Sequence, residues 1–519
     1  MTLNWGVNLI IIFDFMYVRR LKSKNGKTYI QVVDKSSGRY KVVESFGGVS
    51  NKAEEEVLVA RAKSWINERT GRAEFDFSDL DAVFESFMDS ITTMKKVGYD
   101  LLLGKIFDEI GFNKIEDDLF RELVIARIAF PKSKLKTKDY LYRFKQIRFD
   151  EDQIYRYLDK LHNKQKDLVQ TISYDHTLKI LNHDISVVFY DVTTLYFEID
   201  QEDELRKTGF SKEGKHQNPQ IVLGLLVSKN GYPLAYEIFE GNKFEGHTML
   251  PVVEAFKLKY QLNRLVIIAD SGLLSRTNME ELQEKGYEFI LGARIKNETH
   301  IIKQKILALE LSNGESTVIR KGNLKLIITY SEDRAKKDRY NREKGLRRLE
   351  KYIRRGKLTK SNINNRGYNK FLKLEGEINV AIDYDKLKLD AMWDGLKGYL
   401  SNAKIPKDQI LENYQQLWQI EKAFRIAKTD LKIRPIYHRL QKRIEAHICI
   451  SFVAYKVYKE LERQLYEKKA RISANTAIEI AENIFEVAIQ LPQNGKTKSK
   501  ILFTTEEHKY LNSLFEFGC

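Results

Sequence analysis

The chain has 519 residues, of which 43% are hydrophobic and 31% charged, and its formal net charge is +16 at pH 7. A typical domain has about 100–200 residues, so we expect several domains. The composition excludes a wholly disordered chain, a collagen-like fibre and a membrane bundle. Two cysteines, Cys449 and Cys519, are too few for a disulfide framework or a cysteine-based zinc finger, which favours a reducing cytoplasm.

The positive charge is concentrated in three segments. Residues 16–44 carry a net +6, residues 331–360 carry +8 and residues 431–471 carry +7, so the remaining residues sum to −5. Basic segments on a nearly neutral body are typical of a surface that follows an extended polyanion such as nucleic acid. A lysine-rich surface that is merely solvated gives the same net charge, and both interpretations stay open at this point.

The first 170 residues predict two small domains. Residues 1–15 contain an apolar run at 9–13 that is too short to span a membrane and has no basic leader, so we expect Met16 to be the natural start. Residues 16–50 alternate polar and apolar residues around turn signals, which predicts a basic β-meander and a possible DNA-binding domain. Residues 52–170 show helical periodicity and predict a helical domain.

The stretch 184–293 is the most informative part of the chain. Its patterns predict the order β-β-β-α-β-α-β, a three-stranded meander followed by two βα crossovers. This is the order of a ribonuclease-H-like core, so the expected fold class is α/β. Residues 295–405 predict a β-rich insertion domain around a basic helix, residues 406–470 complete the core with a late helix, and 471–519 form a C-terminal tail without a clear motif.

Two aspartates of this core are candidate metal ligands. Asp191 lies within the first predicted strand, and Asp270 ends the strand LVIIAD. Either residue alone is more often a cap or a turn residue. In the predicted topology, however, their strands are neighbours and the two carboxylates meet at one edge. Two adjacent carboxylates repel each other unless a cation lies between them, which favours a Mg²⁺ site.

The late helix supplies a third carboxylate. Tyr414, Glu421 and Lys428 are spaced seven residues apart, a spacing that drifts only about 20° per step around a helix. Trp418 and Arg425 fall on the same stripe. A surface stripe anchored in the core by Trp418 is the alternative interpretation.

Several motifs in this order resemble DDE transposases of the insertion-sequence-four superfamily. The segments that carry the resemblance include FYDVTTLYFE, IIADSGLLS and LWQIEKAFRIAKTDLKIRPIYH, and it extends over residues 184–460. The late helix of that superfamily has the signature Tyr, two residues, Arg, three residues, Glu, six residues, Lys. Tyr414, Leu417, Glu421 and Lys428 stand at these positions, so leucine replaces the signature arginine.

The resemblance implies an enzyme that nicks transposon ends and joins the freed 3′-ends to target DNA, that is, cut-and-paste transposition. It implies that Asp191, Asp270 and Glu421 bind two Mg²⁺ ions, or Mn²⁺ as a substitute, about 3.5–4 Å apart. The expected partners of the chain are then double-stranded DNA and a second copy of the chain. The DNA comprises the terminal inverted repeats and the target, and the two copies form a homodimer on paired ends. A bacterial, cytoplasmic and nucleoid-associated protein without a membrane segment is expected.

The resemblance also implies that Tyr414 and Lys428 contact phosphates near the cleaved bond. Trp418 either stacks on an unpaired base or packs in the core. The remaining candidates for DNA contact are Arg425, Arg434, His438 and Arg443. The alternative interpretation is that these side chains are solvated charges on a helix surface. Two other functions stay open: a ribonuclease-H-like nuclease without strand transfer, and a catalytically inactive DNA-binding relative.

Overall fold

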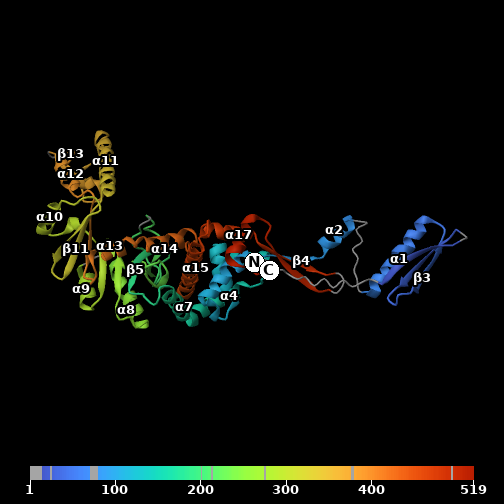
Figure 1. Cartoon of the computed structure of the whole chain (residues 1–519). Helices are drawn as coiled ribbons and strands as arrows, with labels where there is room; N and C mark the ends of the chain where they lie inside the picture. Colours follow the sequence, from blue (N-terminus) through green and yellow to red (C-terminus); the bar gives the residue numbers. More distant parts are fainter. Residues whose placement is uncertain are drawn as a thin grey trace. The chain divides into compact units, whose positions relative to one another are not determined.

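The computed structural model describes residues 15–518 apart from 24–25, 71–79, 200, 212–213, 274–275, 376–378 and 492–494 (Figure 1). Residues 1–14, on which the proposed start at Met16 depends, lie outside this description. The chain divides into two compact units, Met1–Thr92 with Ala488–Lys498 and Thr93–Val487 with Ser499–Cys519. None of the helices in the described ranges is long and apolar enough to cross a membrane.

The first unit contains an antiparallel sheet of order β1-β2-β3, formed by β1 (Met16–Lys22), β2 (Thr28–Asp34) and β3 (Lys41–Val49). Helix α1 (Lys52–Thr70) packs on this sheet through a small core of Ile30, Val32, Ala62 and Ile66. A second helix, α2 (Leu80–Asp89), follows. The helical range expected at 52–170 is therefore divided, because α1 buries its apolar residues against the meander.

The second unit is built on an eight-stranded mixed sheet of order β10-β11-β14-β9-β8-β5-β6-β7. Its central strands are β5 (Val187–Tyr196), β6 (Gln220–Ser228), β7 (Pro233–Glu240), β8 (Val266–Ala269) and β9 (Glu288–Ala293). Strands β5, β6 and β7 pair antiparallel, whereas β8 runs parallel to both β5 and β9. Parallel neighbours need crossover connections, which α8 (Met249–Lys259) and α9 (Arg276–Glu284) provide. The element order is the one predicted for 184–293.

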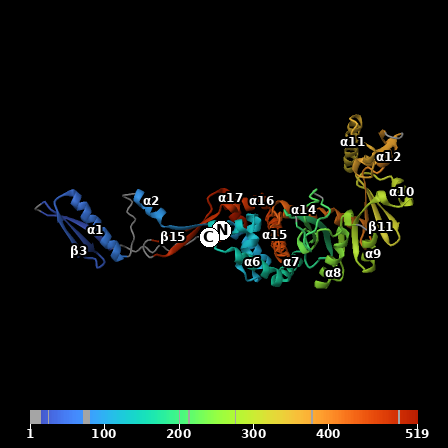
Figure 2. The ribbon, with the colours of Figure 1, turned by 180° about the vertical axis from the view of Figure 1, so that it is seen from behind.

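Both faces of the central strands are buried, and side chains that alternate along a strand enter two different hydrophobic clusters. On β5, Val188 and Tyr190 belong to a hydrophobic cluster with α8, whereas Phe189 and Leu195 belong to a second, larger cluster. The larger cluster includes residues of α13 (Lys407–Gln415), α14 (Trp418–Thr429) and α15 (Gln441–Glu467). Helices α8 and α14 accordingly lie on opposite sides of the sheet in both views (Figures 1 and 2).

A helical layer continues the larger core. Helix α15 is buried along most of its length and contacts several helices of the 93–180 range. These helices are α3 (Lys105–Ile110), α4 (Asp118–Ala129), α6 (Glu151–Lys160) and α7 (Lys166–Ile180), and α5 (Lys134–Tyr140) contacts α6.

The C-terminal segment expected to be a tail is folded. It forms α16 (Ala474–Glu482), β15 (Phe485–Gln490), β16 (Thr497–Leu502) and α17 (Glu506–Phe515). Strands β15 and β16 form a three-stranded sheet with β4 (Ile91–Lys96), in the order β16-β15-β4. Leu511, Phe515 and Phe517 are buried in the larger core, which is why this segment is ordered without a recognisable motif.

The range 295–405 only partly forms a separate insertion. Strands β10 (Ser316–Lys321), β11 (Leu324–Tyr330) and β14 (Leu396–Ser401) extend the main sheet, because β14 pairs antiparallel with both β9 and β11. Helix α10 (His300–Leu307) precedes them. The rest of the range has a core of its own around Leu349, Phe371 and Leu372. It consists of α11 (Glu332–Arg354), β12 (Leu372–Glu375), β13 (Asn379–Ile382) and α12 (Tyr384–Ala391).

Candidate active site

Asp191 lies in the middle of β5 and is half-buried. The backbone N–H of Val192 donates a 2.8 Å hydrogen bond to its Oδ1. Because side chains alternate along a strand, Asp191 is on the same face as Phe189 and Leu195, which belong to the larger core. This is the face that α14 covers, and α14 contacts β5 and β6 directly.

Asp270 directly follows the buried strand β8 and is exposed. Strands β5 and β8 are parallel, with Val187 opposite Val266 and Phe189 opposite Ile268. Continuing this register by two residues places Asp191 level with Asp270, on the same face of the sheet. The two aspartates, 79 positions apart in sequence, are therefore brought to neighbouring points of one sheet edge.

The late helix is interrupted at Gln416 and Leu417, between α13 and α14. Here the backbone hydrogen bonds span three residues, from Leu417 N–H to the Tyr414 carbonyl (3.0 Å) and from Gln419 N–H to the Gln416 carbonyl (2.9 Å). Such bonds tighten the turn relative to an α-helix. The predicted continuous stripe is thus divided, with Tyr414 on α13 and with Glu421 and Lys428 on α14.

Tyr414 is buried and its hydroxyl reaches one of the candidate acids. Its hydroxyl donates a long hydrogen bond of 3.5 Å to Asp270 Oδ1, and its ring lies edge-on to Tyr399. Burial and the Asp270 carboxylate raise the pKa of Tyr414 above its usual value. Gly292 on β9 makes room for this contact, since a Cβ there would lie 2.6 Å from the Tyr414 hydroxyl. Tyr414 therefore contacts a candidate ligand rather than solvent.

Glu421 is exposed in the first turn of α14. A carboxylate in this position is stabilised by the helix dipole. Its charge acts on both Tyr414 and Lys397, so it lies in the same neighbourhood as Asp270, which acts on the same two residues.

The three carboxylates by themselves do not form a complete metal-binding site. Among the described residues, no three His, Cys, Asp or Glu side chains are grouped closely enough to hold one ion. The donor chemistry nevertheless fits a hard divalent cation, since all three groups present carboxylate oxygens. Mg²⁺ commonly binds through one or two carboxylates together with substrate phosphates, so a complete cage in the protein alone is not required.

Lys397 is a residue of this site that the sequence did not reveal. It lies on β14, half-buried, with its ammonium 4.9 Å from the centre of the Tyr414 ring. Burial and the Arg334 guanidinium lower the pKa of Lys397, whereas the Asp270 and Glu421 carboxylates act in the opposite direction. A single lysine in a short strand gave no signal, because its charged neighbours are distant in the chain.

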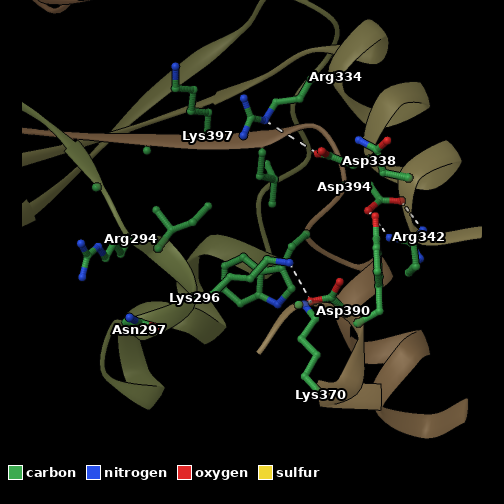
Figure 3. Close-up of a pocket in the computed structure, with 18 of the residues that line it drawn as sticks. Arg294, Lys296, Asn297, Arg334, Asp338, Arg342, Lys370, Asp390, Asp394 and Lys397 are labelled. Atoms are coloured by element: carbon green, nitrogen blue, oxygen red, sulfur yellow. Dashed lines mark hydrogen bonds and ion pairs between the residues drawn. The ribbon is translucent and has the colours of Figure 1, made fainter. Parts of the chain in front are cut away.

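A pocket of about 540 Å³ borders this lysine, between β14, α11 and the end of α12 (Figure 3). Lys397 and Arg334 lie at one end of it, where Arg334 Nε is 3.7 Å from Asp338 Oδ2. At the other end Asp390 Oδ1 accepts hydrogen bonds from Lys296 (2.7 Å) and Lys370 (3.0 Å). Most charges along the wall, including Arg334, are therefore neutralised, whereas Lys397 interacts electrostatically with the candidate ligands Asp270 and Glu421.

Leu417 is buried, whereas the neighbouring Trp418 is exposed. Leu417 is 8% exposed and belongs to the larger core, so the position of the signature arginine is occupied by a packing residue. Trp418 is 49% exposed, which corrects the interpretation of this residue as a core anchor. The tightened turn at Gln416 and Leu417 directs Leu417 inward and leaves the next side chain in solvent. Arg425 is exposed and Lys428 is half-buried on the same helix.

The three candidates after α14 differ from one another. Arg434 is half-buried, with its guanidinium 5.5 Å from the centre of the Tyr196 ring. His438 is only 9% exposed, and burial together with Lys134 and Arg127 lowers its pKa to about 3. Arg443 binds Asp159 through two nitrogens, at 3.0 and 3.4 Å. Neither His438 nor Arg443 is a solvated helix charge, and Arg443 is already neutralised by a carboxylate.

One family model matches the chain. The family model described as "Transposase DDE domain" matches residues 182–456, more than half of the chain. Among solved structures, the chain is similar to piggyBac transposase in a synaptic complex with hairpin DNA, with 10% identity over 74% of this chain and 78% of that chain and a TM-score of 0.38.

Two structures of Mos1 transposase are more distant. The paired-end complex with the left transposon end has 12% identity over 44% of this chain and 71% of that chain, with a TM-score of 0.16. The mariner paired-end complex with Mn has 13% identity over 46% of this chain and 78% of that chain, with a TM-score of 0.15. No curated protein sequence matches the chain.

Proposed function

Because the chain belongs to the transposase DDE domain family, we propose that it is a DNA transposase of the insertion-sequence-four superfamily. It cleaves DNA at transposon ends and joins the freed 3′-ends to target DNA. The observation that carries this proposal is the parallel register of β5 and β8, which supports Asp191 and Asp270 as neighbouring ligands on the face covered by α14.

Asp191, Asp270 and Glu421 bind divalent metal ions through their carboxylate oxygens. Two Mg²⁺ ions, or Mn²⁺ in their place, supply Lewis-acid chemistry for attack on a DNA phosphodiester and for departure of the 3′-oxygen when they are bound. Tyr414 is a positioning residue for Asp270, because its hydroxyl bonds to that carboxylate. Lys397 attracts the phosphate backbone toward the acids, which otherwise repel it.

Other residues of α14 and its surroundings hold the DNA. Lys428 contacts phosphate as a point charge, as does the exposed Arg425. The exposed ring of Trp418 offers a surface on which a base stacks, one turn before Glu421. The meander of β1 to β3 and helix α11 are further candidates for DNA binding, since their lysine and arginine side chains are largely exposed. A homodimer on paired ends follows from the need to cut two ends together.

The test uses the full-length protein, Mg²⁺ and a duplex that carries the inverted repeats bordering its gene, with supercoiled plasmid as target. We expect nicking at the repeat ends and joined products in the plasmid, both abolished by EDTA and restored by Mn²⁺. Nicking without joined products would favour the nuclease without strand transfer. Specific binding of the repeats without any nicking would favour the inactive DNA-binding relative.

A further inference from the structure

A strongly basic pocket lies away from the carboxylates, where the helical layer meets the loop after α14. Its volume is about 580 Å³. Its walls come from the end of α4, the start of α5 with the segment before it, α6, the loop between α14 and α15, and α15 itself. None of its lining residues is an aspartate or glutamate. The basic ones among them, apart from two histidines, are Arg127, Lys132, Lys134, Lys136, Lys432 and Arg434.

Two of these cations are deeply buried, and the described residues provide neither of them with a counter-ion. Arg127 is 5% exposed; its Nη1 reaches only the carbonyl oxygens of Leu431 (3.5 Å) and Lys432 (3.4 Å). Within the described part of the chain its Nε has no hydrogen-bond partner. Lys134 is 7% exposed, and no carboxylate of the described residues pairs with its ammonium. Burial and the Arg127 charge hold the pKa of Lys134 well below its usual value.

Two buried histidines complete the floor of the pocket. His438 and His447 are stacked edge to face, with ring centres 5.6 Å apart. His447 Nε2 lies 2.9 Å from the Ile433 carbonyl oxygen, which can only accept, so this nitrogen carries the proton. The charges that act on the two rings, from Arg127, Lys134 and Arg443, are all positive, and Arg443 alone has a carboxylate partner.

A buried cation that lacks a partner destabilises the folded protein, and two that face each other do so further. A bound ligand of opposite charge would neutralise these groups and offset that cost. We propose that this pocket binds one phosphate group, with Arg127 and Lys134 as its buried ligands, and that the phosphate belongs to the backbone of bound DNA. The assignment to DNA rests on the proposed function, whereas the phosphate site itself does not.

The rim favours a nucleic acid over a free ion. The exposed side chains of Lys132, Lys136 and Lys432 surround the mouth, where they meet the phosphates on either side of the buried one. Tyr437 is 70% exposed at the same mouth and offers a ring to a sugar or a base. A free phosphate ion contacts the floor of the pocket, but it reaches neither the lysines of the rim nor the Tyr437 ring.

The first experiment measures thermal unfolding of the full-length protein with inorganic phosphate and needs neither DNA nor metal. Phosphate should raise the melting temperature of the wild type, because a ligand that binds only the folded state stabilises it. Lys134→Met should lose this response and melt a few degrees higher in phosphate-free buffer, since it removes an unpaired buried charge. Lys134→Arg should restore the response. Lys164→Met, an exposed lysine outside the pocket, is the matched control.

The second experiment measures binding of a random-sequence duplex at several salt concentrations. Lys134→Met should bind more weakly than Lys164→Met, with a salt slope smaller by about one. Equal duplex binding with a lost phosphate response would overturn the assignment to DNA and leave a free-phosphate site. Equal behaviour of the two variants in both experiments would overturn the site. Failure of the protein to nick DNA affects neither measurement, so the two proposals fail separately.

Discussion

The candidate active site and the basic pocket are both clusters of like charge, but water reaches them differently. Asp270 and Glu421 are exposed, whereas Arg127 and Lys134 are almost fully buried. Exposed like charges are screened and cost the fold little, while buried ones cost much more. Removing an acid should therefore affect activity and leave stability unchanged, whereas removing a buried cation should affect binding and increase stability.

The largest effect is expected for the acids. Asp191→Asn, Asp270→Asn and Glu421→Gln should each reduce the nicking rate by at least about a thousandfold, because each removes a metal ligand. The melting temperatures of Asp270→Asn and Glu421→Gln should stay near that of the wild type, because both carboxylates are exposed. The nicking assay and a thermal melt of the same preparations check this.

The matched control for the acids is Glu240→Gln, which changes an exposed carboxylate at the end of β7 in the same sheet. It should nick at the wild-type rate. Undiminished nicking by Asp191→Asn would contradict the site assignment. A large loss of stability in Asp270→Asn or Glu421→Gln would contradict the contrast between exposed and buried charge.

The next effect comes from adding a cation to the core. Leu417→Arg restores the signature residue of the superfamily but places a guanidinium in the larger core, so the free energy of unfolding should fall by about 2–4 kcal/mol. Urea denaturation measures it. The neighbouring exposed position provides the control, since Trp418→Arg should change the same quantity by less than about 1 kcal/mol. A stable and more active Leu417→Arg would show that the position opens to DNA.

A smaller effect is expected where a cation lies beside the acids. Lys397→Met removes a positive charge near Asp270 and Glu421, so the affinity for Mn²⁺ should rise by about two- to tenfold. Titration of free Mn²⁺ by electron paramagnetic resonance measures this affinity. Lys373→Met, on the exposed strand β12, should leave it unchanged. Weaker Mn²⁺ binding in Lys397→Met would instead mean that the lysine orders the carboxylates.

The smallest effect is a pH dependence of the pocket. Burial and nearby cations lower the pKa of His438 from its usual 6.5 to about 3. Between these values the unfolded chain binds more protons than the folded one, so stability present above pH 6.5 is lost as the pH falls. The slope is at most about 1.4 kcal/mol per pH unit for one histidine.

Urea denaturation in phosphate-free buffer between about pH 7 and 5 measures this slope. His438→Asn should reduce it, while His447 continues to contribute in the same direction. His300→Asn, at an exposed position, should not change it. An equal slope in His438→Asn would mean that the ring is not buried in its neutral form.

Local patterns predicted the central part of the fold well. Alternation along β5 and the apolar strand of β8 indicated the strands, and the crossover rule then placed Asp191 beside Asp270. The break between α13 and α14 was not predictable, because the spacing of Tyr414, Glu421 and Lys428 is compatible with a continuous helix. The break depends on where Leu417 packs, and that is decided by residues far along the chain.

Segment charge was the weakest guide. The segment 431–471 carries +7, which indicated a basic face beside the active site. In the structure Lys456 is fully buried against the Ser173 carbonyl, and Arg463 and Arg443 pair with Glu460 and Asp159. A count of charges does not report partners, since Glu460 lies one turn before Arg463 on the same helix, whereas Asp159 and Ser173 lie on other helices.

The sequence by itself determined the order of the core elements and the family resemblance, and it supplied the three acids as candidates, because each depends on local pattern and spacing. Only the tertiary structure decided which charges are exposed, paired or buried alone. Trp418 is exposed and Leu417 buried, and Lys397 reaches the acids while Arg127 and Lys134 share a pocket without a carboxylate. These relations join residues far apart in the chain, and burial and long-range pairing are set by packing rather than by sequence neighbours.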